Sequence, residues 1–163
     1  MGSGKSTVAR EVAVALDCCA IDLDELINQR EKRSPSEIIK QSGEDEFRRI
    51  ETEALRQLLQ QELNGGVVAI IALGGGAWTL QRNRDLIIKH EVLTVWLDVP
   101  FELCWERIQT SSAVRPLAPS REIAEKLYRE RRPAYELAKV HIVTTAPTSA
   151  TETANKIIET VLR

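Results

Sequence analysis

The chain begins with a glycine-rich segment that leads directly into an amphipathic one, and this beginning limits the folds open to it. Gly2-Ser3-Gly4-Lys5-Ser6-Thr7 matches the second half of the phosphate-binding motif G-x-x-x-x-G-K-[ST], whose first glycine would fall two residues before Met1. Glycines at a helix N-terminus let backbone N–H groups converge on a phosphate chain, and the helix dipole favours its negative charge. The alternative is a chance Gly/Ser-rich helix start, since both residue types also cap helices.

We therefore predict a nucleotide-binding site made of Gly2, Ser3, Gly4, Lys5, Ser6 and Thr7. In this site the Lys5 ammonium reaches the β- and γ-phosphates of the nucleotide, and the Ser6 hydroxyl ligates Mg²⁺.

Helical and strand-like segments alternate over the rest of the chain, which is typical of an α/β fold with a parallel sheet. The apolar patterns predict helices over about 5–16, over 44–63 and after 149, and strands over 18–21, 67–73, 92–97 and 140–144. The final helix begins at a capping box from Ser149 to Glu152 and presents an apolar stripe to the core: Ala154, Ile157, Ile158, Val161 and Leu162. No repeat or linker divides the 163 residues, so we expect one domain over 1–163.

The composition gives the chain no general affinity for nucleic acid or membranes. Its 22 basic and 24 acidic residues leave a net charge of −2, so an anionic ligand must be held by a local cluster. No apolar run approaches the roughly 20 residues that span a bilayer. Cys18, Cys19 and Cys104 lack the spacing of a disulfide framework or a zinc site. We expect a cytoplasmic monomer without nucleic-acid or membrane partners.

Two carboxylates, Asp22 and Asp24, follow the first expected strand. In open parallel sheets, ligands bind outside the carboxyl ends of the strands, and alternate residues of an extended chain point the same way. Both carboxylates are therefore expected to face one site, where one holds the metal and the other accepts the proton of an attacking hydroxyl. We assign the metal to Asp22 and the proton to Asp24. The alternative is that either aspartate caps the following helix.

Five motifs in register resemble those of shikimate kinases. They are Asp22-x-Asp24, the segment Ser42-Gly43-Glu44-Asp45-Glu46-Phe47-Arg48-Arg49-Ile50-Glu51, Gly74-Gly75-Gly76-Ala77, Arg115-Pro116-Leu117 and Arg131-Arg132-Pro133-Ala134-Tyr135. The resemblance implies a nucleoside-monophosphate-kinase-like P-loop fold, with three α/β/α layers around a parallel five-stranded sheet of strand order 2-3-1-4-5. It also implies a substrate-binding segment at about 24–63 and a lid at about 109–121.

The reaction implied by the resemblance transfers the γ-phosphoryl group of ATP to the 3-hydroxyl of shikimate, with Mg²⁺, in aromatic amino-acid biosynthesis. Arg48 and Arg131 then bind the substrate carboxylate, for which a planar guanidinium is suited, and Arg132 is the alternative to Arg131. On the residues alone, Arg48 has an equal alternative in surface pairs with Glu44 and Glu51 on its helix.

Three further roles follow from the same resemblance. The middle glycine, Gly75, donates its backbone N–H to a substrate hydroxyl, although a glycine run can also mark a tight turn. Arg115, in the lid, neutralises charge on the transferring phosphoryl group and acts with Asp24 and Lys5 as a catalytic residue. Arg107 is the weaker candidate for stacking on adenine.

Two further residues, Trp78 and Asp98, have no role in the reaction that the resemblance implies. Trp78 follows the glycine run where the family usually has a small aliphatic residue, which makes the fit of the substrate uncertain at this point. Asp98, two residues before Pro100, is interpreted as a turn or cap residue at the end of its strand.

The start of the chain departs from the family. The family's loop reads Gly-Phe-Met-Gly-Ala/Ser-Gly-Lys-Ser, and Met1 falls on its internal methionine. Upstream, the family has a short apolar strand that lies between the strands represented here by 67–73 and 92–97. We expect Met1 to be an internal methionine preceded by roughly ten residues that form this strand. Without that strand, two apolar strands keep unpaired backbone edges across a central gap.

Two other functions remain open on the sequence. One is a kinase for another small hydroxy acid, such as gluconate, and the other is a non-catalytic nucleotide-binding module, suggested by the incomplete phosphate loop. The paired Asp22 and Asp24, Phe47-Arg48 and the three glycines at 74–76 favour shikimate.

Overall fold

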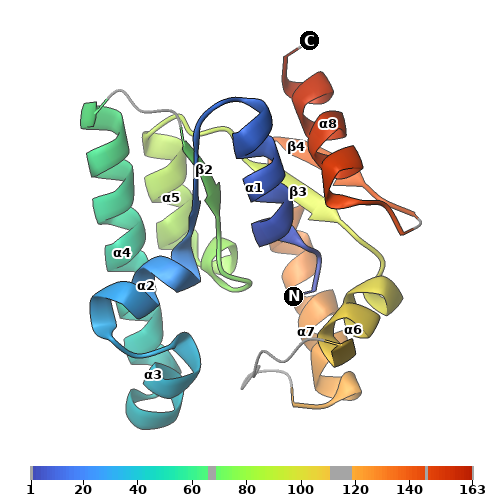
Figure 1. Ribbon diagram of the computed structural model, residues 1–163. Coiled ribbons are helices and arrows are strands. Elements are labelled where there is room, and N and C mark those ends of the chain that lie inside the picture. Colours follow the sequence, from blue (N-terminus) through green and yellow to red (C-terminus); the bar gives the residue numbers. More distant parts are fainter. Residues whose placement is uncertain (1, 66–68, 111–118, 146, 163) are drawn as a thin grey trace.

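The structure is a computed structural model that describes residues 2–65, 69–110, 119–145 and 147–162 (Figure 1). The strands are β1 (Cys19–Asp22), β2 (Ala69–Ala72), β3 (Val95–Asp98) and β4 (Val140–Val143). The helices are α1 (Lys5–Ala15), α2 (Leu23–Glu31), α3 (Pro35–Ser42), α4 (Glu44–Gly65), α5 (Gln81–Lys89), α6 (Phe101–Thr110), α7 (Arg121–Tyr135) and α8 (Ala150–Val161), with a short 3₁₀ helix, η1 (Ala77–Thr79).

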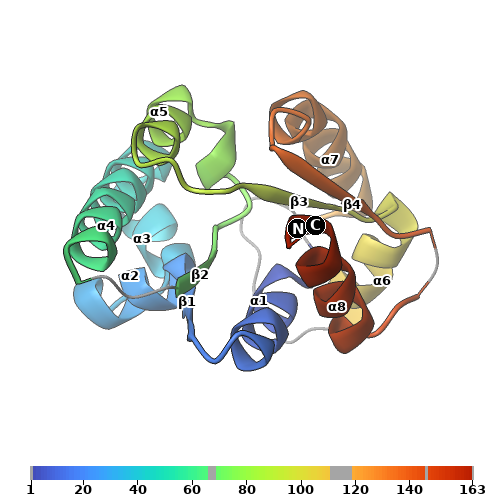
Figure 2. The ribbon, with the colours of Figure 1, turned by 90° about the horizontal axis from the view of Figure 1, so that it is seen from above.

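The strands form two parallel pairs. β1 pairs with β2, which places Asp22 opposite Ala72, and β3 pairs with β4, which places Asp98 opposite Val143. α1 packs against β1 and β2, α8 packs against β4, and these two helices lie side by side (Figures 1 and 2). The α/β class and the parallel direction of the strands are therefore confirmed. The expected single five-stranded sheet is not observed over the described ranges, where each pair is a separate two-stranded sheet.

A groove of about 400 Å³ separates the two sheets. The residues of β2 and the following Leu73 line one side, Thr94 and residues 95–97 of β3 line the other, and apolar residues of α1 and α8 complete the groove. Val161 and Leu162 lie along this groove and are 38% and 71% exposed. The prediction that both belong to the core is wrong, because the part of the core that they face is this open groove.

The buried core is divided in the same way. One apolar cluster joins α2, α3, α4, η1 and α5, and its buried members include Leu23, Ile27, Ile38, Leu55 and Trp78. The other cluster joins α1, α8 and β4, and its buried members are Val8, Val12, Ile142, Ala154 and Ile157. The apolar stripe of α4 is buried, in agreement with the helix predicted over 44–63: Phe47, Ile50, Ala54 and Leu58.

Local capping explains where several helices begin. The capping box from Ser149 to Glu152 is present at the start of α8, as the sequence predicts. A second capping box, from Ser34 to Glu37, starts α3, which the periodicity did not reveal because this helix has only eight residues.

None of the described helices is long and apolar enough to cross a membrane.

Candidate active site

The phosphate loop leads into α1, and its glycines are required by its shape. Gly2 and Gly4 have φ values of 69° and 84°, in the left-handed region that favours glycine. A Cβ atom on Gly2 would lie 2.3 Å from the carbonyl oxygen of Cys104 in α6, so no side chain fits there. Arg107 of α6 donates to the carbonyl oxygens of Gly2 and Ser3, at 3.4 and 3.3 Å. The loop is thus held from α6, and Arg107 lies next to it.

Ser6 and Asp22 connect the loop to the end of β1. The Ser6 hydroxyl donates to Oδ2 of Asp22, while Oδ1 accepts from the backbone N–H of Asp24 at 2.9 Å and of Glu25 at 3.3 Å. Asp22 is therefore the N-cap of α2, and one of its oxygens still faces the phosphate loop. A hydroxyl and a carboxylate oxygen side by side are the donor types that Mg²⁺ prefers, so these two residues fit the ion.

Asp24 lies in the first turn of α2 and not on an extended chain. The prediction that Asp22 and Asp24 face one way because they alternate along a strand is therefore wrong, since β1 ends at Asp22. Asp24 instead points to the turn after β2, where a Cβ atom on Gly74 would lie 2.8 Å from Oδ1 of Asp24 and 2.9 Å from Oε1 of Glu51. Gly74 thus lies between two carboxylates from α2 and α4.

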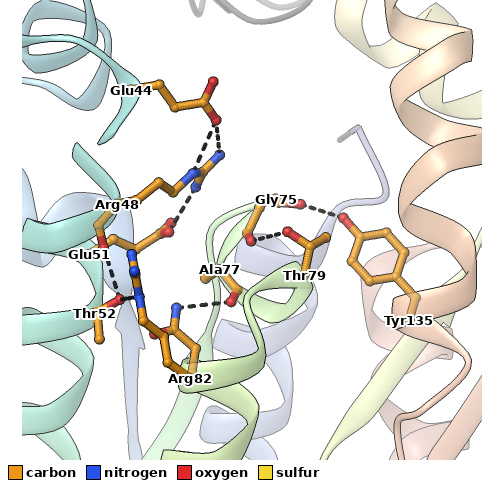
Figure 3. A network of polar contacts seen from close by, with 11 residues as sticks. Glu44, Arg48, Glu51, Thr52, Gly75, Ala77, Thr79, Arg82 and Tyr135 are labelled. Atoms are coloured by element: carbon orange, nitrogen blue, oxygen red, sulfur yellow. Dashed lines mark hydrogen bonds and ion pairs between the residues drawn. The ribbon is translucent and has the colours of Figure 1, made fainter. Parts of the chain in front are cut away.

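A buried ion pair lies on α4 beside this turn (Figure 3). Nη1 of Arg48 is 2.8 Å from Oε2 of Glu51, and both Nε and Nη2 of Arg48 donate to Oε1 of Glu44, at 3.2 and 3.0 Å. Arg48 is 9% exposed and Glu51 is fully buried. Both helix pairs considered for Arg48 are therefore present, but the pair with Glu51 is a buried contact and not a surface one.

Glu51 is the least satisfied group of the cluster. Its Oε1 has no hydrogen-bond partner among the described residues. Burial raises the pKa of the Glu51 carboxyl above its ordinary value and Asp24 adds to the rise, while the charges of Arg48 and Arg131 oppose it. A buried carboxylate held by one arginine and close to a second marks this place as one built for charged groups.

The three glycines form a tight turn after β2, between α4 and α7. A Cβ atom on Gly76 would lie 2.3 Å from Nη2 of Arg48, so the guanidinium packs directly against the backbone. The Tyr135 hydroxyl of α7 donates to the carbonyl oxygen of Gly75. Arg48 and Tyr135 approach the turn from opposite sides (Figure 3). The glycine run therefore forms a tight turn, as the alternative interpretation states, and two side chains lie directly against its backbone.

Arg131 and Arg132 have different surroundings, although they are neighbours on α7. Arg132 makes a two-pronged ion pair with Asp98, with both N···O distances 2.7 Å. Arg131, in contrast, opposes the rise that burial causes in the pKa of the Glu51 carboxyl and of the Tyr135 hydroxyl. The interpretation of Asp98 as a turn or cap residue is wrong, because its carboxylate is the partner of Arg132.

Arg115 and most of the expected lid lie outside the described residues. α6 ends at Thr110 and α7 begins at Arg121, so the expected lid spans the connection between these two helices.

A second pocket of about 240 Å³ lies beside the phosphate loop. It is lined by residues of the loop and α1, of α6, and of the segment after β4: Ser3, Gly4, Thr7, Arg107, Thr144, Thr148 and Thr153 among others. This pocket borders the phosphate loop, whereas the cluster of Asp24, Arg48 and Glu51 surrounds the glycine turn. The sequence did not point to Thr144, Thr148 and Thr153, because none of them belongs to a motif.

A phosphate loop with oxygen donors for a cation, and a separate charged cluster at the end of the next strand, are the arrangement of a phosphate-loop kinase that acts on a small molecule. The family model for shikimate kinase matches residues 1–162, and the chain belongs to this family.

Individual relatives agree with this assignment. The shikimate kinase of Helicobacter hepaticus is 36% identical over 160 residues, which cover 98% of this chain and 90% of the relative. A solved structure of shikimate kinase from Acinetobacter baumannii in complex with shikimate superposes with a TM-score of 0.89 at 31% identity, covering 99% of this chain and 88% of that one. A gluconokinase from Sinorhizobium meliloti superposes with a TM-score of 0.61 at 18% identity, over 99% of this chain and 91% of that one, and shares the fold alone.

Proposed function

We propose that the protein transfers the γ-phosphoryl group of ATP to the 3-hydroxyl of shikimate, a step of aromatic amino-acid biosynthesis. Membership of the shikimate kinase family supports this, and the observation in the molecule that carries it is the charged cluster around the glycine turn. Two arginines and the Asp24 carboxylate suit a substrate that is both a carboxylic acid and an alcohol. A purely apolar pocket would not select for either group.

The nucleotide is assigned to the phosphate loop and the pocket beside it. Backbone N–H groups of 2–7 and the Lys5 ammonium bind the phosphate chain, and Arg107 and Thr144 border the space for the base. Ser6 and Asp22 would hold Mg²⁺, which neutralises charge on the β- and γ-phosphates when it is bound. Arg115, in the connection between α6 and α7, is assigned to the transferring phosphoryl group by the resemblance.

Shikimate is assigned to the segment 24–63, the glycine turn and the end of α7. Arg48 and Arg131 bind its carboxylate, and the Gly75 N–H binds a hydroxyl. A guanidinium carries five N–H donors, and the bonds to Glu44 and Glu51 use three of those of Arg48, so it can hold its helix partners and a ligand together. Asp24 then accepts the proton of the 3-hydroxyl as that oxygen attacks the γ-phosphorus.

The two alternatives are tested by a substrate panel. We expect ADP formation with shikimate, and a kcat/KM for gluconate that is lower by at least roughly 10³, because gluconate is flexible and has a different set of hydroxyls. Equal rates with both acids would favour a kinase for another hydroxy acid, and ATP binding without any turnover would favour a non-catalytic module.

A test of the metal site uses the double role of Asp22. Asparagine caps helices as well as aspartate does, so Asp22→Asn should keep the melting temperature (Tm) within about 2 °C. Loss of the charge next to Ser6 should raise the Mg²⁺ concentration that gives half-maximal turnover by roughly 10–100-fold. Asp17→Asn, a change of the same type just after α1, is the matched control. An unchanged Mg²⁺ titration would remove Asp22 from the metal site.

We further propose that the two strand pairs belong to one five-stranded parallel sheet, in which a further strand fills the groove and completes the order 2-3-1-4-5. The groove supports this because it is apolar on both sides and is bordered by β2 and β3. Ser3 and Lys5 also line it, so a strand that leads into the phosphate loop would lie within it. Such a strand would pair the backbone edges of β2 and β3 that face the groove.

Adding about ten residues of continuous apolar sequence, ending in Gly-x, ahead of Met1 should therefore stabilise the protein. Each new backbone hydrogen bond contributes about 1 kcal/mol, and each kcal/mol raises Tm by roughly 2–4 °C at this size, so we expect a rise of at least about 10 °C. The control is a polar extension of the same length that contains proline. If both extended chains melt within about 2 °C of the 163-residue chain, no strand enters the groove.

The protein is further proposed to act as a monomer in the cytoplasm. Its cysteines, Cys18, Cys19 and Cys104, are free thiols, as is usual for proteins of reducing compartments.

A further inference from the structure

One ion pair in the described structure joins α7 to the carboxyl end of β3. The Arg132 guanidinium donates to both oxygens of Asp98 at 2.7 Å, and its Cζ lies 4.8 Å from the centre of the Trp96 ring. Nη1 also donates to the Tyr128 hydroxyl at 3.2 Å, and that hydroxyl donates to the carbonyl oxygen of Val99 at 3.0 Å. The Asp98 side chain is 15% exposed.

This pair differs from the other ion pairs that α7 makes. Arg129 pairs with Glu125 within the helix, and its side chain is 76% exposed, which is the kind of pair that contributes little. The pair between Arg132 and Asp98 is two-pronged, its Asp98 side chain is mostly shielded from solvent, and its guanidinium stacks on an indole ring; it connects residues 34 positions apart on two elements. It therefore fixes a helix to a strand.

The helix needs such an attachment at this point. Pro133 lies inside α7 and has no N–H, so one bond of the helix's own ladder is missing in its last turns. Two other contacts of this helix turn go to the region of the glycine turn: Nε1 of Trp78 donates to the carbonyl oxygen of Ala134 at 2.8 Å, and the Tyr135 hydroxyl donates to the carbonyl oxygen of Gly75. The Asp98 contact joins the same helix turn to β3.

We propose that Asp98 and Arg132 are positioning residues for the substrate, because their ion pair sets the rotation of α7 that points Arg131 at the substrate carboxylate. Successive residues of a helix are turned by about 100°, so a helix that is locked to β3 through Arg132 presents Arg131 to the glycine turn. Arg131 opposes the rise that burial causes in the pKa of the Glu51 carboxyl and of the Tyr135 hydroxyl, which agrees with that direction. This inference rests on the proposed binding of shikimate by Arg131.

The test is the change in KM for each substrate in Arg132→Met. Methionine keeps an unbranched apolar stem against Trp96 but makes no ion pair. We expect KM for shikimate to rise about tenfold, while KM for ATP and kcat at saturating shikimate stay within about twofold. Arg132→Lys keeps the charge without the planar fork and should lie between the two. The matched control on α7 is Arg129→Met, which should leave both KM values within about twofold.

A double-mutant cycle separates positioning from a general structural role. If Arg132 acts through Arg131, then adding Arg132→Met to Arg131→Met should change KM for shikimate by less than about twofold. A full tenfold effect in that background, or equal rises in both KM values, would overturn the proposal. Should Arg132→Met fail to fold, Asp98→Asn, which keeps the size of the side chain, replaces it in the same cycle.

The outcomes distinguish this proposal from the proposed function. If the unmodified protein does not phosphorylate shikimate, the proposed function fails. If it does, and Arg132→Met and Asp98→Asn both keep its KM for shikimate while they lower Tm, only the positioning role is wrong.

Discussion

Replacing Asp24 with asparagine should lower turnover by roughly 10²–10⁴ while the fold stays intact. Asparagine matches the size of aspartate but does not take up the proton of an attacking hydroxyl. The cap of α2 should stay in place in this variant, because it is made by Asp22, which accepts from the backbone N–H of residue 24. The measurement is kcat with saturating ATP and shikimate, together with Tm.

A matched control is available on the same helix turn. Glu25 is exposed, and its carboxylate pairs with Arg10 across the surface at 3.0 Å. Glu25→Gln should therefore leave kcat within about twofold. If Asp24→Asn and Glu25→Gln have the same small effect, then Asp24 does not accept the proton, and another group must be found for this step.

Replacing Arg48 with methionine should produce two large effects at once. The first is on the substrate, because a charged hydrogen bond contributes about 1.5–3 kcal/mol, so the affinity for shikimate should fall about tenfold to 150-fold while that for ATP is unchanged. The second is on stability, because the variant leaves the buried Glu51 without its partner. Breaking such a pair costs about 3–5 kcal/mol, which corresponds to roughly 10 °C in Tm.

The pH dependence of that loss identifies its cause. Burial raises the pKa of Glu51 and Arg48 opposes the rise, so removing Arg48 should raise it further. A carboxyl whose pKa is higher in the folded chain stabilises the fold below its unfolded pKa, and this stabilisation is lost as pH rises through the folded value. The difference in Tm between the unmodified protein and Arg48→Met should therefore grow from about pH 5 to about pH 8.

A second substitution checks this explanation. Glu51→Gln, added to Arg48→Met, removes the group that would have to ionise, so the pH-dependent part of the loss should disappear while the weak binding of shikimate remains. Equal losses of ATP and shikimate affinity in Arg48→Met would mean that Arg48 has only a structural role. A stability loss that is independent of pH would remove Glu51 as its cause.

The parts of the fold that the sequence predicted well are those with a strong local signal. The α4 stripe and the capping box of α8 depend on spacing within one short segment, and the parallel direction of the strands follows from the alternation of helices and strands along the chain. The position of Val161 and Leu162 does not, because their exposure depends on what lies between β2 and β3. Periodicity shows which face of a helix is apolar, but not whether anything covers it.

The candidate site shows the same division. The roles of the phosphate loop and of Arg48 could be predicted from their motifs. The roles of Glu51 and Asp98 could not, because they depend on burial and on partners that the tertiary structure provides. The spacing between Glu51 and Arg48 is that of any surface ion pair on a helix, so the sequence predicts a surface pair. Only the burial of Glu51 in the structure distinguishes it from such a pair. Trp78 was a departure from the family pattern, and the structure shows it buried and hydrogen-bonded to α7.

The most direct test of the account is ADP formation by the purified 163-residue chain, measured with ATP and Mg²⁺ in the presence and absence of shikimate. We predict turnover that depends on shikimate, with the phosphate recovered on its 3-hydroxyl, and that falls by at least roughly 10² in Asp24→Asn. ADP formation at the same rate without shikimate, or in Asp24→Asn as in the unmodified protein, would contradict the assignment of the cluster around the glycine turn as the site of phosphoryl transfer.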